Sequence, residues 1–444
     1  MFILRDLLTP LQATFPMSDE GLRRRSWFTY TLLAIIVPFT SSRTSNLLRS
    51  LRTLFGLRLG ETCYYRFMAS PKLPWHRLWA ALWRAIPAPL TEGRLVVVLD
   101  DSINPKTGKK IFACQHFYDH ARKLNQARYP WSQNIVSIGL LKSIKGRWCC
   151  LPLAFEYYFM KKDLEAKAVR IGKASIPFRT KFAQATHMLN RLANVFLEVP
   201  LLVVTDSWFG NNGLLKPLRE AIGARVHLLS RLRSNAALYA QPPAPEGQRG
   251  PGRPRKYGVK LGSVSDLAAS YRPLAQSYCV SLYGKVRELQ AYSQVVMLKT
   301  LKCPVRVVWV YQGTQWIALV STDLTLTIEQ IIEFYGARWK IEAGFREIKQ
   351  EIGSSQSQTR NPFAVTNHLQ FCMMATTLVW IYADRIDHTP ARRYITDERT
   401  EFAFGDVRRM ISEILAKEDF DSLCVKPTQP KRNPLIATIL RLVA

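Results

Sequence analysis

The fold is decided by an apolar run at residues 94–101, with the sequence RLVVVLDD. Because the run is continuous rather than alternating, it predicts a strand that is buried on both faces of a sheet. A second run, LLVVTD at residues 201–206, has the same form and also ends in an acid. The two runs therefore predict two central strands, each followed by carboxylates.

The segments around these two runs indicate the rest of the core. Strands are expected at about 134–142 and 147–157, with Lys145-Gly146 as the turn between them. A helix at about 179–197 precedes the second run, and a helix at 213–222 and a strand at 224–230 follow it. This order predicts an α/β fold with an RNase H-like core, that is, a mixed five-stranded sheet with helices.

The second half of the chain predicts a β-rich insertion and then a long helix. A loop rich in proline, glycine and arginine occupies 240–262, and strand-like runs follow at 277–282, 294–297, 305–311 and 315–321. The helix is expected over 328–352, because Thr327 and Gln330 form a capping box and Gly353 is a stop signal.

These features divide the chain into five segments. We predict a helical DNA-binding domain at 1–90, the core at 91–234 and 326–388, the insertion at 235–325 and a basic helical C-terminal region at 389–444. The N-terminal segment could equally be a helical extension packed on the core, since it has no clear helix-turn-helix signature.

The composition indicates a nucleic-acid partner. The 444 residues include 62 Lys and Arg against 33 Asp and Glu, a net charge of +29, while 48% of the residues are hydrophobic. A globular protein with this charge favours a polyanion, because neutralising phosphates releases counterions. The sequence predicts no signal peptide, and polar residues interrupt the apolar stretches, so we expect a cytoplasmic protein that does not enter membranes.

Acidic side chains stand where metal-dependent cleavage of phosphodiesters would need them. Asp100 and Asp101 end the first run, Asp206 ends the second, and Glu342 lies on the predicted helix. Mg²⁺ prefers carboxylate oxygens, and two such ions can activate an attacking oxygen and stabilise a leaving one. Successive strand residues point to opposite faces, so only one of Asp100 and Asp101 can face Asp206. A single acid after an apolar strand can also be an ordinary strand end.

The predicted helix places an acid among cations. Tyr335, Arg338, Glu342, Arg346 and Lys349 fall within an arc of roughly 80° if the helix turns by about 100° per residue. Such a face can bind a metal ion beside phosphates. It could also be a solvated surface with ion pairs four residues apart. We favour phosphate binding, because the three cations would otherwise gather without an anion.

The spacing Tyr335-x2-Arg338-x3-Glu342-x6-Lys349 resembles the Y-R-E-K signature of bacterial insertion-sequence DDE transposases, which cut and paste DNA through hairpins. Asp-Ser at 101–102 and Thr-Asp-Ser at 205–207 resemble the first and second acid motifs of that family. The resemblance spans about residues 94–352.

The resemblance implies that Asp101, Asp206 and Glu342 are the catalytic and metal-binding triad. Asp100 remains an alternative for the first position. It also implies two Mg²⁺ ions, which Mn²⁺ can replace. Tyr335, Arg338 and Lys349 would then hold DNA phosphates near the transposon end, and Arg346 is expected to bind DNA from the same face.

Two features of the insertion resemble DNA-binding elements. Arg253, with Arg255 and Lys256 beside it, lies in a sequence similar to an AT-hook, although a flexible basic loop would have the same composition. Trp316 resembles the insertion tryptophan that stacks on a flipped base in hairpin-forming relatives. A tryptophan packed in the sheet is the alternative there, and it is favoured for Trp309.

The expected function is therefore DNA transposition. The expected steps are nicking at the terminal inverted repeats, hairpin formation and strand transfer into target DNA, performed by a homodimer that synapses two ends. The alternative is a catalytically inactive, transposase-derived DNA-binding protein. A tyrosine recombinase would need an Arg/His/Arg set around Tyr335, which the sequence lacks.

Overall fold

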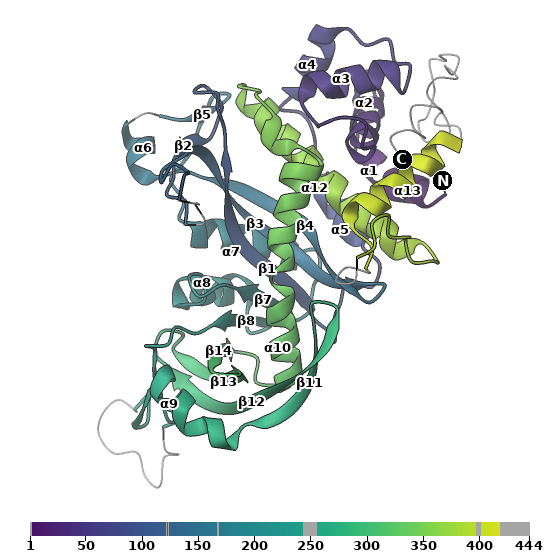
Figure 1. Ribbon diagram of the computed structural model, residues 1–444. Coiled ribbons are helices and arrows are strands. Elements are labelled where there is room, and N and C mark those ends of the chain that lie inside the picture. Colours follow the sequence, from purple (N-terminus) through teal and green to yellow (C-terminus); the bar gives the residue numbers. More distant parts are fainter. Residues whose placement is uncertain are drawn as a thin grey trace.

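The computed structural model describes residues 2–120, 122, 124–166, 168–242, 255–396 and 401–417. It confirms a mixed α/β protein, built around one 12-stranded sheet (Figure 1). Five core strands form one end of this sheet in the order β4-β3-β1-β7-β8: β1 (Leu95–Pro105), β3 (Trp131–Ile144), β4 (Arg147–Tyr158), β7 (Leu201–Thr205) and β8 (Val226–Arg231). The β4–β3 and β3–β1 pairs are antiparallel, whereas β1–β7 and β7–β8 are parallel.

Strand β1 runs beyond the point at which the sequence predicted its end. Its pairing with β3 continues to Pro105, which lies opposite Ser132. The two acids are consequently inside the strand rather than after it. Because strand residues alternate between faces, Asp100 and Asp101 lie on opposite sides of the sheet.

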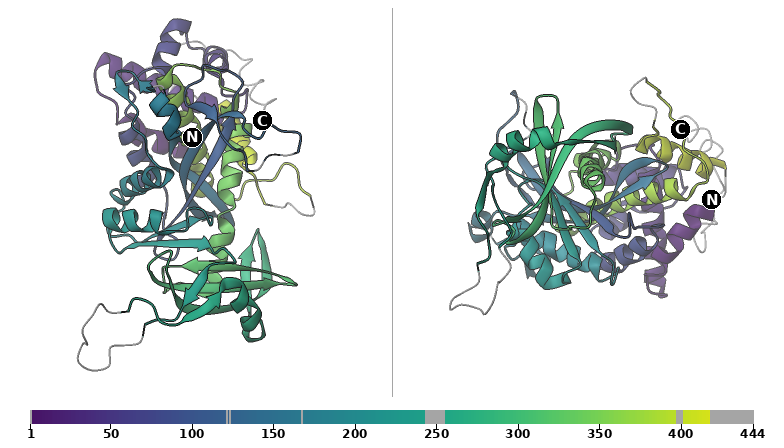
Figure 2. Two further views of the ribbon diagram at one scale, coloured as in Figure 1. Left: turned by 90° about the vertical axis from the view of Figure 1, so that its left-hand side faces the viewer. Right: turned by 90° about the horizontal axis from the view of Figure 1, so that it is seen from below.

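The insertion extends the central sheet instead of forming a separate one. Its elements are β9 (Ala237–Tyr239), β10 (Lys260–Ser263), α9 (Val264–Tyr271), η1 (Arg272–Leu274), β11 (Gln276–Leu282), β12 (Lys285–Leu298), β13 (Cys303–Gln312) and β14 (Gln315–Ser321). Strand β14 pairs with β8 of the core, which joins the two parts. The insertion strands curve around the helical column that follows them (Figure 2).

Helices cover both faces of the central strands. On one face are α7 (Lys181–Ala193) and α8 (Asn212–Ile222); on the other are α10 (Ile328–Ala337) and α11 (Lys340–Arg346). Val96, Val98 and Val204 form one buried cluster with Phe334 and Ile341. This cluster anchors α10 and α11 to β1 and β7.

The long helix predicted over 328–352 is interrupted, which corrects that expectation. The backbone N–H of Arg338 donates to Tyr335 and that of Ile341 to Arg338, so the chain tightens to three-residue spacing between α10 and α11. After α11 come a π-helical turn, η2 (Glu347–Glu351), and a 3₁₀ turn, η3 (Ser354–Gln356). Gly353 has the positive φ of 83° expected of a helix stop.

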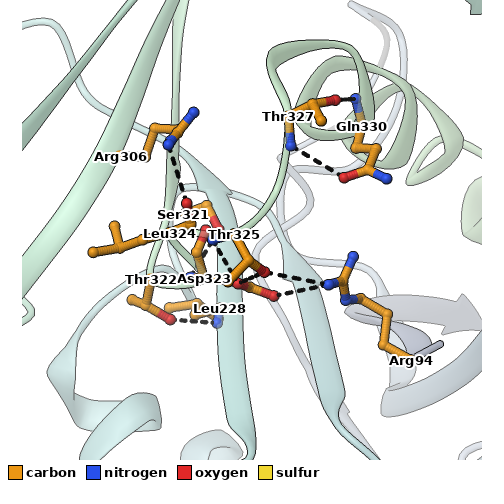
Figure 3. Close-up of polar contacts among 10 residues, drawn as sticks. All are labelled: Arg94, Leu228, Arg306, Ser321, Thr322, Asp323, Leu324, Thr325, Thr327 and Gln330. Carbon is orange, nitrogen blue, oxygen red and sulfur yellow. Dashed lines mark hydrogen bonds and ion pairs between the residues drawn. The ribbon is translucent and has the colours of Figure 1, made fainter. Parts of the chain in front are cut away.

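A polar turn fixes where α10 starts relative to β1 (Figure 3). Asp323 accepts hydrogen bonds from Thr325 and lies 3.5 Å from a guanidinium nitrogen of Arg94, which directly precedes β1. Thr327 and Gln330 form the predicted capping box at the first turn of α10. The start of β1 and the start of α10 are thus connected through one carboxylate.

The N-terminal helices pack on the core through α12 (Pro362–Arg385). They are α1 (Phe2–Gln12), α2 (Asp19–Ile36), α3 (Thr44–Thr53), α4 (Glu61–Met68) and α5 (Trp75–Arg84). The indole of Trp75 donates to Asn367 of α12 at 2.7 Å, and that of Trp83 donates to the carbonyl of Leu153 in β4 at 3.2 Å. This region therefore shares one hydrophobic core with the sheet.

The remaining described elements are peripheral: β2 (Cys114–His116), α6 (Lys161–Ala166), β5 (Arg170–Ile171), β6 (Ala174–Ser175) and α13 (Phe404–Lys417). Residues 418–444 of the predicted C-terminal region lie outside the described residues. Neither the 24-residue helix α12 nor any other helix of the described chain meets the length and apolarity that a membrane span requires.

Candidate active site

The parallel register of β1 and β7 brings two aspartates side by side. Val98 lies opposite Val204 and Leu99 opposite Thr205, so the next residues along the two strands are Asp100 and Asp206. Paired residues on neighbouring strands point to the same face. Val98 and Val204 face the cluster beneath α10 and α11, and Asp100 and Asp206 continue that face.

Arg338 links Asp100 of β1 to Glu342 of α11. Its guanidinium lies 3.2 Å from Oδ2 of Asp100 and 3.4 Å from Oε1 of Glu342. Arg338 stands at the tightened turn between α10 and α11, which directs it toward the strand ends. Asp100 and Glu342 therefore share one cation, and Asp206 is near enough to act on the same guanidinium electrostatically.

Burial makes these groups electrostatically unusual. Desolvation raises the pKa of Asp100 from 3.8 to about 7; Arg338 opposes that rise and the neighbouring charge of Asp206 adds to it. Burial also raises the pKa of Glu342, against the effect of Arg338. Desolvation alone would lower the pKa of Arg338, but Tyr335 and the acids hold it above its ordinary value. Burial and mutual repulsion therefore disfavour the ionised form of these carboxyls, and perturbed acids of this kind are common at functional sites.

Asp101, the residue predicted as the first acid, lies elsewhere. Its Oδ2 is 2.7 Å from Nζ of Lys181 on α7 and accepts a hydrogen bond from Asn134 at 3.2 Å. The structure thus brings Asp206 and Glu342 together with Asp100 instead of Asp101.

The donor set suits a hard divalent cation, although its present geometry does not form a metal site. Among the described residues, no three Asp, Glu, His or Cys side chains are close enough together to hold a metal ion. The Arg338 guanidinium lies between Asp100 and Glu342. Carboxylate oxygens are nevertheless the ligands that Mg²⁺ and Mn²⁺ prefer.

The other two cations of the predicted helix face, Lys349 and Arg346, do not lie together in the structure. Lys349 turns inward, where its ammonium donates to Ser102 Oγ at 2.6 Å and to the carbonyl of Ile103 at 2.7 Å. Burial lowers the pKa of Lys349 to about 8. Arg346 is exposed. Lys349 is therefore placed to hold β1 in position, and Arg346 is the cation that solvent can reach.

A neighbouring acid on the same helical segment points into the core. Glu347 is buried and its Oε2 accepts a hydrogen bond from the indole of Trp380 at 3.0 Å. Burial raises the pKa of Glu347 to about 8. Glu342 is consequently the acid of this segment that faces the aspartates.

A cavity of about 730 Å³ opens beside the acids, between the insertion strands and α10. Trp316 of β14 lines it, as do Tyr335 and Arg338 from the α10–α11 segment. Its wall also contains the aromatic residues Tyr283 and Trp339 and the cations Arg231 and Arg287. Aromatic and cationic side chains thus meet at the edge of the acid cluster.

A sequence comparison identifies the family. The DDE superfamily endonucleases match residues 19–285, which is more than half of the chain and includes Asp100, Asp101 and Asp206. The chain belongs to the DDE superfamily endonucleases. No curated protein matches the sequence.

The residues that the sequence analysis singled out in the insertion of this DDE endonuclease differ in their burial. Trp309 is fully buried and its indole donates to the carbonyl of Val264 at 3.1 Å, so it is a core residue. Trp316 is only partly buried. Arg255 and Lys256 are exposed, while Arg253 and the rest of the AT-hook-like loop lie outside the described residues.

Several residues around the acid cluster of the DDE endonuclease were not singled out from the sequence. Trp339 directly follows Arg338 in the sequence, which was the available signal, and its indole is exposed in the structure. Arg231 and Arg287 had no local signal, because β8 and the insertion strand β12, which bring them to the cavity, are distant from Arg338 in sequence.

Proposed function

We propose that this DDE superfamily endonuclease is a DNA transposase that nicks and joins DNA at the ends of an insertion sequence. The observation that carries the proposal is the grouping of Asp100, Asp206 and Glu342 around Arg338, beside a cavity rich in aromatic and cationic side chains. The strand order β4-β3-β1-β7-β8 supports an RNase H-like core, in which acids at the edge of the central strands meet an acid from a helix.

The proposed triad is Asp100, Asp206 and Glu342, with Asp100 replacing Asp101. These carboxylates would hold Mg²⁺, or Mn²⁺ in its place, as a pair of ions that activates the attacking oxygen and stabilises the leaving oxygen at phosphorus. Arg338 keeps the acids together in the DNA-free protein. On binding DNA it turns to a backbone phosphate, for which its planar guanidinium is well suited.

Tyr335 and Arg346, which precede and follow Arg338 in the sequence, are assigned to binding the same DNA substrate. Tyr335 lies in the cavity wall, with its ring 5.8 Å from the guanidinium carbon of Arg338. Arg346 is exposed on the following turn. We assign both to the DNA backbone near the cleaved end, and Lys349 to positioning β1.

The large cavity supports a hairpin pathway. An extruded base could enter it and stack on Trp316 or Trp339, since aromatic faces accept any base. Extrusion of a base bends the backbone enough for a freed 3′-hydroxyl to reach the opposite strand. Arg231 and Arg287 are placed to neutralise the adjoining phosphates.

Further contacts with the terminal inverted repeats are assigned to the basic regions outside the site. The exposed arginines of the N-terminal helices, including Arg49, Arg52 and Arg66, offer one surface. The exposed residues Arg255 and Lys256 offer another, and we assign Arg253 to DNA binding from its sequence alone. Because two ends must be brought together, we propose that the active species is a homodimer.

The test is cleavage of a DNA fragment that carries the ends flanking the gene. The full-length protein is expected to nick these ends in Mg²⁺ or Mn²⁺ and to stop when EDTA is added. Binding to the ends without cleavage in either metal would instead establish the alternative, a catalytically inactive DNA-binding protein. Cleavage that survives EDTA would contradict metal-dependent chemistry.

A further inference from the structure

A second cavity, of about 600 Å³, lies on the other face of β1 from the acid cluster. Its walls come from β1, the segment that follows β2, the start of α7 and the segment that follows β7. Aromatic side chains dominate the lining, among them Tyr118, Tyr158, Phe182 and Trp208. Neither the proposed triad nor the cavity at Trp316 uses these residues.

Trp208 offers a fixed aromatic surface in this cavity. Its ring stacks on that of Phe182, with centroids 4.9 Å apart and planes at 11°. It nevertheless remains 45% exposed. A large, half-exposed ring whose orientation is already fixed can stack on a planar ligand with little loss of side-chain entropy.

The cavity lining carries the acids Asp101 and Asp119 and the cation Lys181, and a further cation, Arg128, lies beside the lining residue Tyr118. Asp101 is neutralised by Lys181, whose ammonium also lies 5.2 Å from the ring of Tyr158 and 5.4 Å from that of Trp208. At the rim, the exposed guanidinium of Arg128 lies 5.3 Å from the ring centre of Tyr118. A stacked guanidinium can still bind a phosphate from solvent.

The cavity also adjoins the proposed catalytic residues Asp100 and Asp206. The backbone N–H of Trp208 donates to Oδ1 of Asp206 at 3.0 Å, and Asp101 directly follows Asp100. The turn that follows β7 and the neighbouring residues Asp100 and Asp101 therefore connect the acid cluster to this cavity.

We propose that this cavity binds one unstacked base of the DNA strand beside the cleaved phosphate. The base stacks on Trp208 and the phosphate at the rim binds Arg128. The net charge of +29 and the continuity with the acid cluster favour DNA as the occupant. This inference rests on the proposed function, because it takes DNA as the substrate.

The first test compares single-stranded with double-stranded DNA in EDTA, where no cleavage occurs. Labelled oligothymidylate and a duplex are titrated with the full-length protein, with Trp208→Ala, with Trp208→Phe and with Tyr394→Ala, a control at an exposed tyrosine elsewhere. We expect Trp208→Ala to weaken single-strand binding by about fivefold to a hundredfold, because a stacking contact is lost. Trp208→Phe should restore most of the affinity, and Tyr394→Ala should match the wild type.

The second test locates the contact directly. Oligothymidylate carrying 5-iododeoxyuridine is crosslinked by light, and the crosslinked peptides are identified by mass spectrometry. We expect crosslinks at Trp208 or Tyr118 that persist in Trp316→Ala. Normal single-strand affinity of Trp208→Ala, with no crosslink at either residue, would overturn this inference and leave the transposase proposal standing.

Two other outcomes also decide the matter. Equal losses of single-strand binding, duplex binding and melting temperature in Trp208→Ala and Trp208→Phe would make Trp208 a folding residue and overturn the inference. A wild-type protein that binds neither DNA form would overturn the proposed function itself.

Discussion

The guanidinium of Arg338 lies 3.2 Å from the carboxylate of Asp100, although 238 residues separate them in sequence. The contact joins the tightened turn between α10 and α11 to the central strand β1. Glu342 is held by the same guanidinium at 3.4 Å. Arg338 thus lies between two of the three acids to which we assign the metal ions.

The first prediction concerns this competition. Arg338→Ala removes the cation between the acids and should tighten Mg²⁺ binding to the DNA-free protein by roughly tenfold, the effect of one nearby unit charge. Isothermal calorimetry measures the affinity, and Arg346→Ala, which removes an exposed arginine of the same segment, should leave it unchanged. Equal Mg²⁺ affinities in Arg338→Ala and the wild type would show that Arg338 does not occupy the metal position.

The second prediction follows from the pKa of Asp100, which burial raises from 3.8 to about 7. Between these two pH values the folded protein binds a proton that the unfolded chain has lost, so this group lowers stability as the pH rises. The full penalty, up to roughly 4 kcal/mol, is present above about pH 7. Asp100→Asn should therefore melt near the wild-type temperature at about pH 4 and above it at about pH 8.

Asp101→Asn is the matched control for that experiment. It removes the partner of Lys181 and should give no gain in melting temperature at the higher pH. An Asp100→Asn protein that is no more stable than the wild type at about pH 8 would rule out the proposed cost of ionising the buried Asp100 carboxyl.

The third prediction separates two cations that the helical pattern had grouped. Lys349→Met should lower the free energy of unfolding by about 1–3 kcal/mol, because the partly buried carbonyl of Ile103 and hydroxyl of Ser102 lose their charged donor. Arg346→Ala should change it by less than about 0.5 kcal/mol. Instead, Arg346→Ala should reduce the slope of log DNA affinity against log salt concentration by about one unit. Denaturant melts and binding titrations in a salt series measure both; the reverse pattern would exchange the two roles.

The fourth prediction concerns Trp316 in the larger cavity. If an extruded base stacks there, Trp316→Ala should leave the first nick near the wild-type rate and slow hairpin formation by about fivefold to a hundredfold. Phe or Tyr at the position should rescue part of the rate. Equal loss of both steps together with a lower melting temperature would make Trp316 a packing residue.

The central strands could be predicted from the sequence, because strands that are buried on both faces appear as continuous apolar runs. The same property left the choice between Asp100 and Asp101 open. Since both faces of β1 are buried, alternation alone does not tell which face meets α11. The register with β7, in which Leu99 lies opposite Thr205, supplies that information.

Helical periodicity was least reliable around Arg338. An ideal helix places Arg338, Arg346 and Lys349 on one face, but three-residue hydrogen bonds at Arg338 and a π-helical turn at 347–351 rotate the later residues. Lys349 consequently points inward to β1. Cavities formed by residues distant in sequence, such as Tyr118 and Trp208, also had no local signal.

The most direct test of the account is metal-dependent nicking of the cognate ends by Asp100→Asn and Asp101→Asn, with Asp206→Asn and Glu342→Gln beside them. The account predicts that Asp100→Asn, Asp206→Asn and Glu342→Gln bind the ends but do not nick them in Mg²⁺ or Mn²⁺, because metal-ligand charge acts on the transition state more than on DNA binding. It predicts measurable nicking by Asp101→Asn. Metal-dependent nicking by Asp100→Asn, with Asp101→Asn inactive, would contradict it.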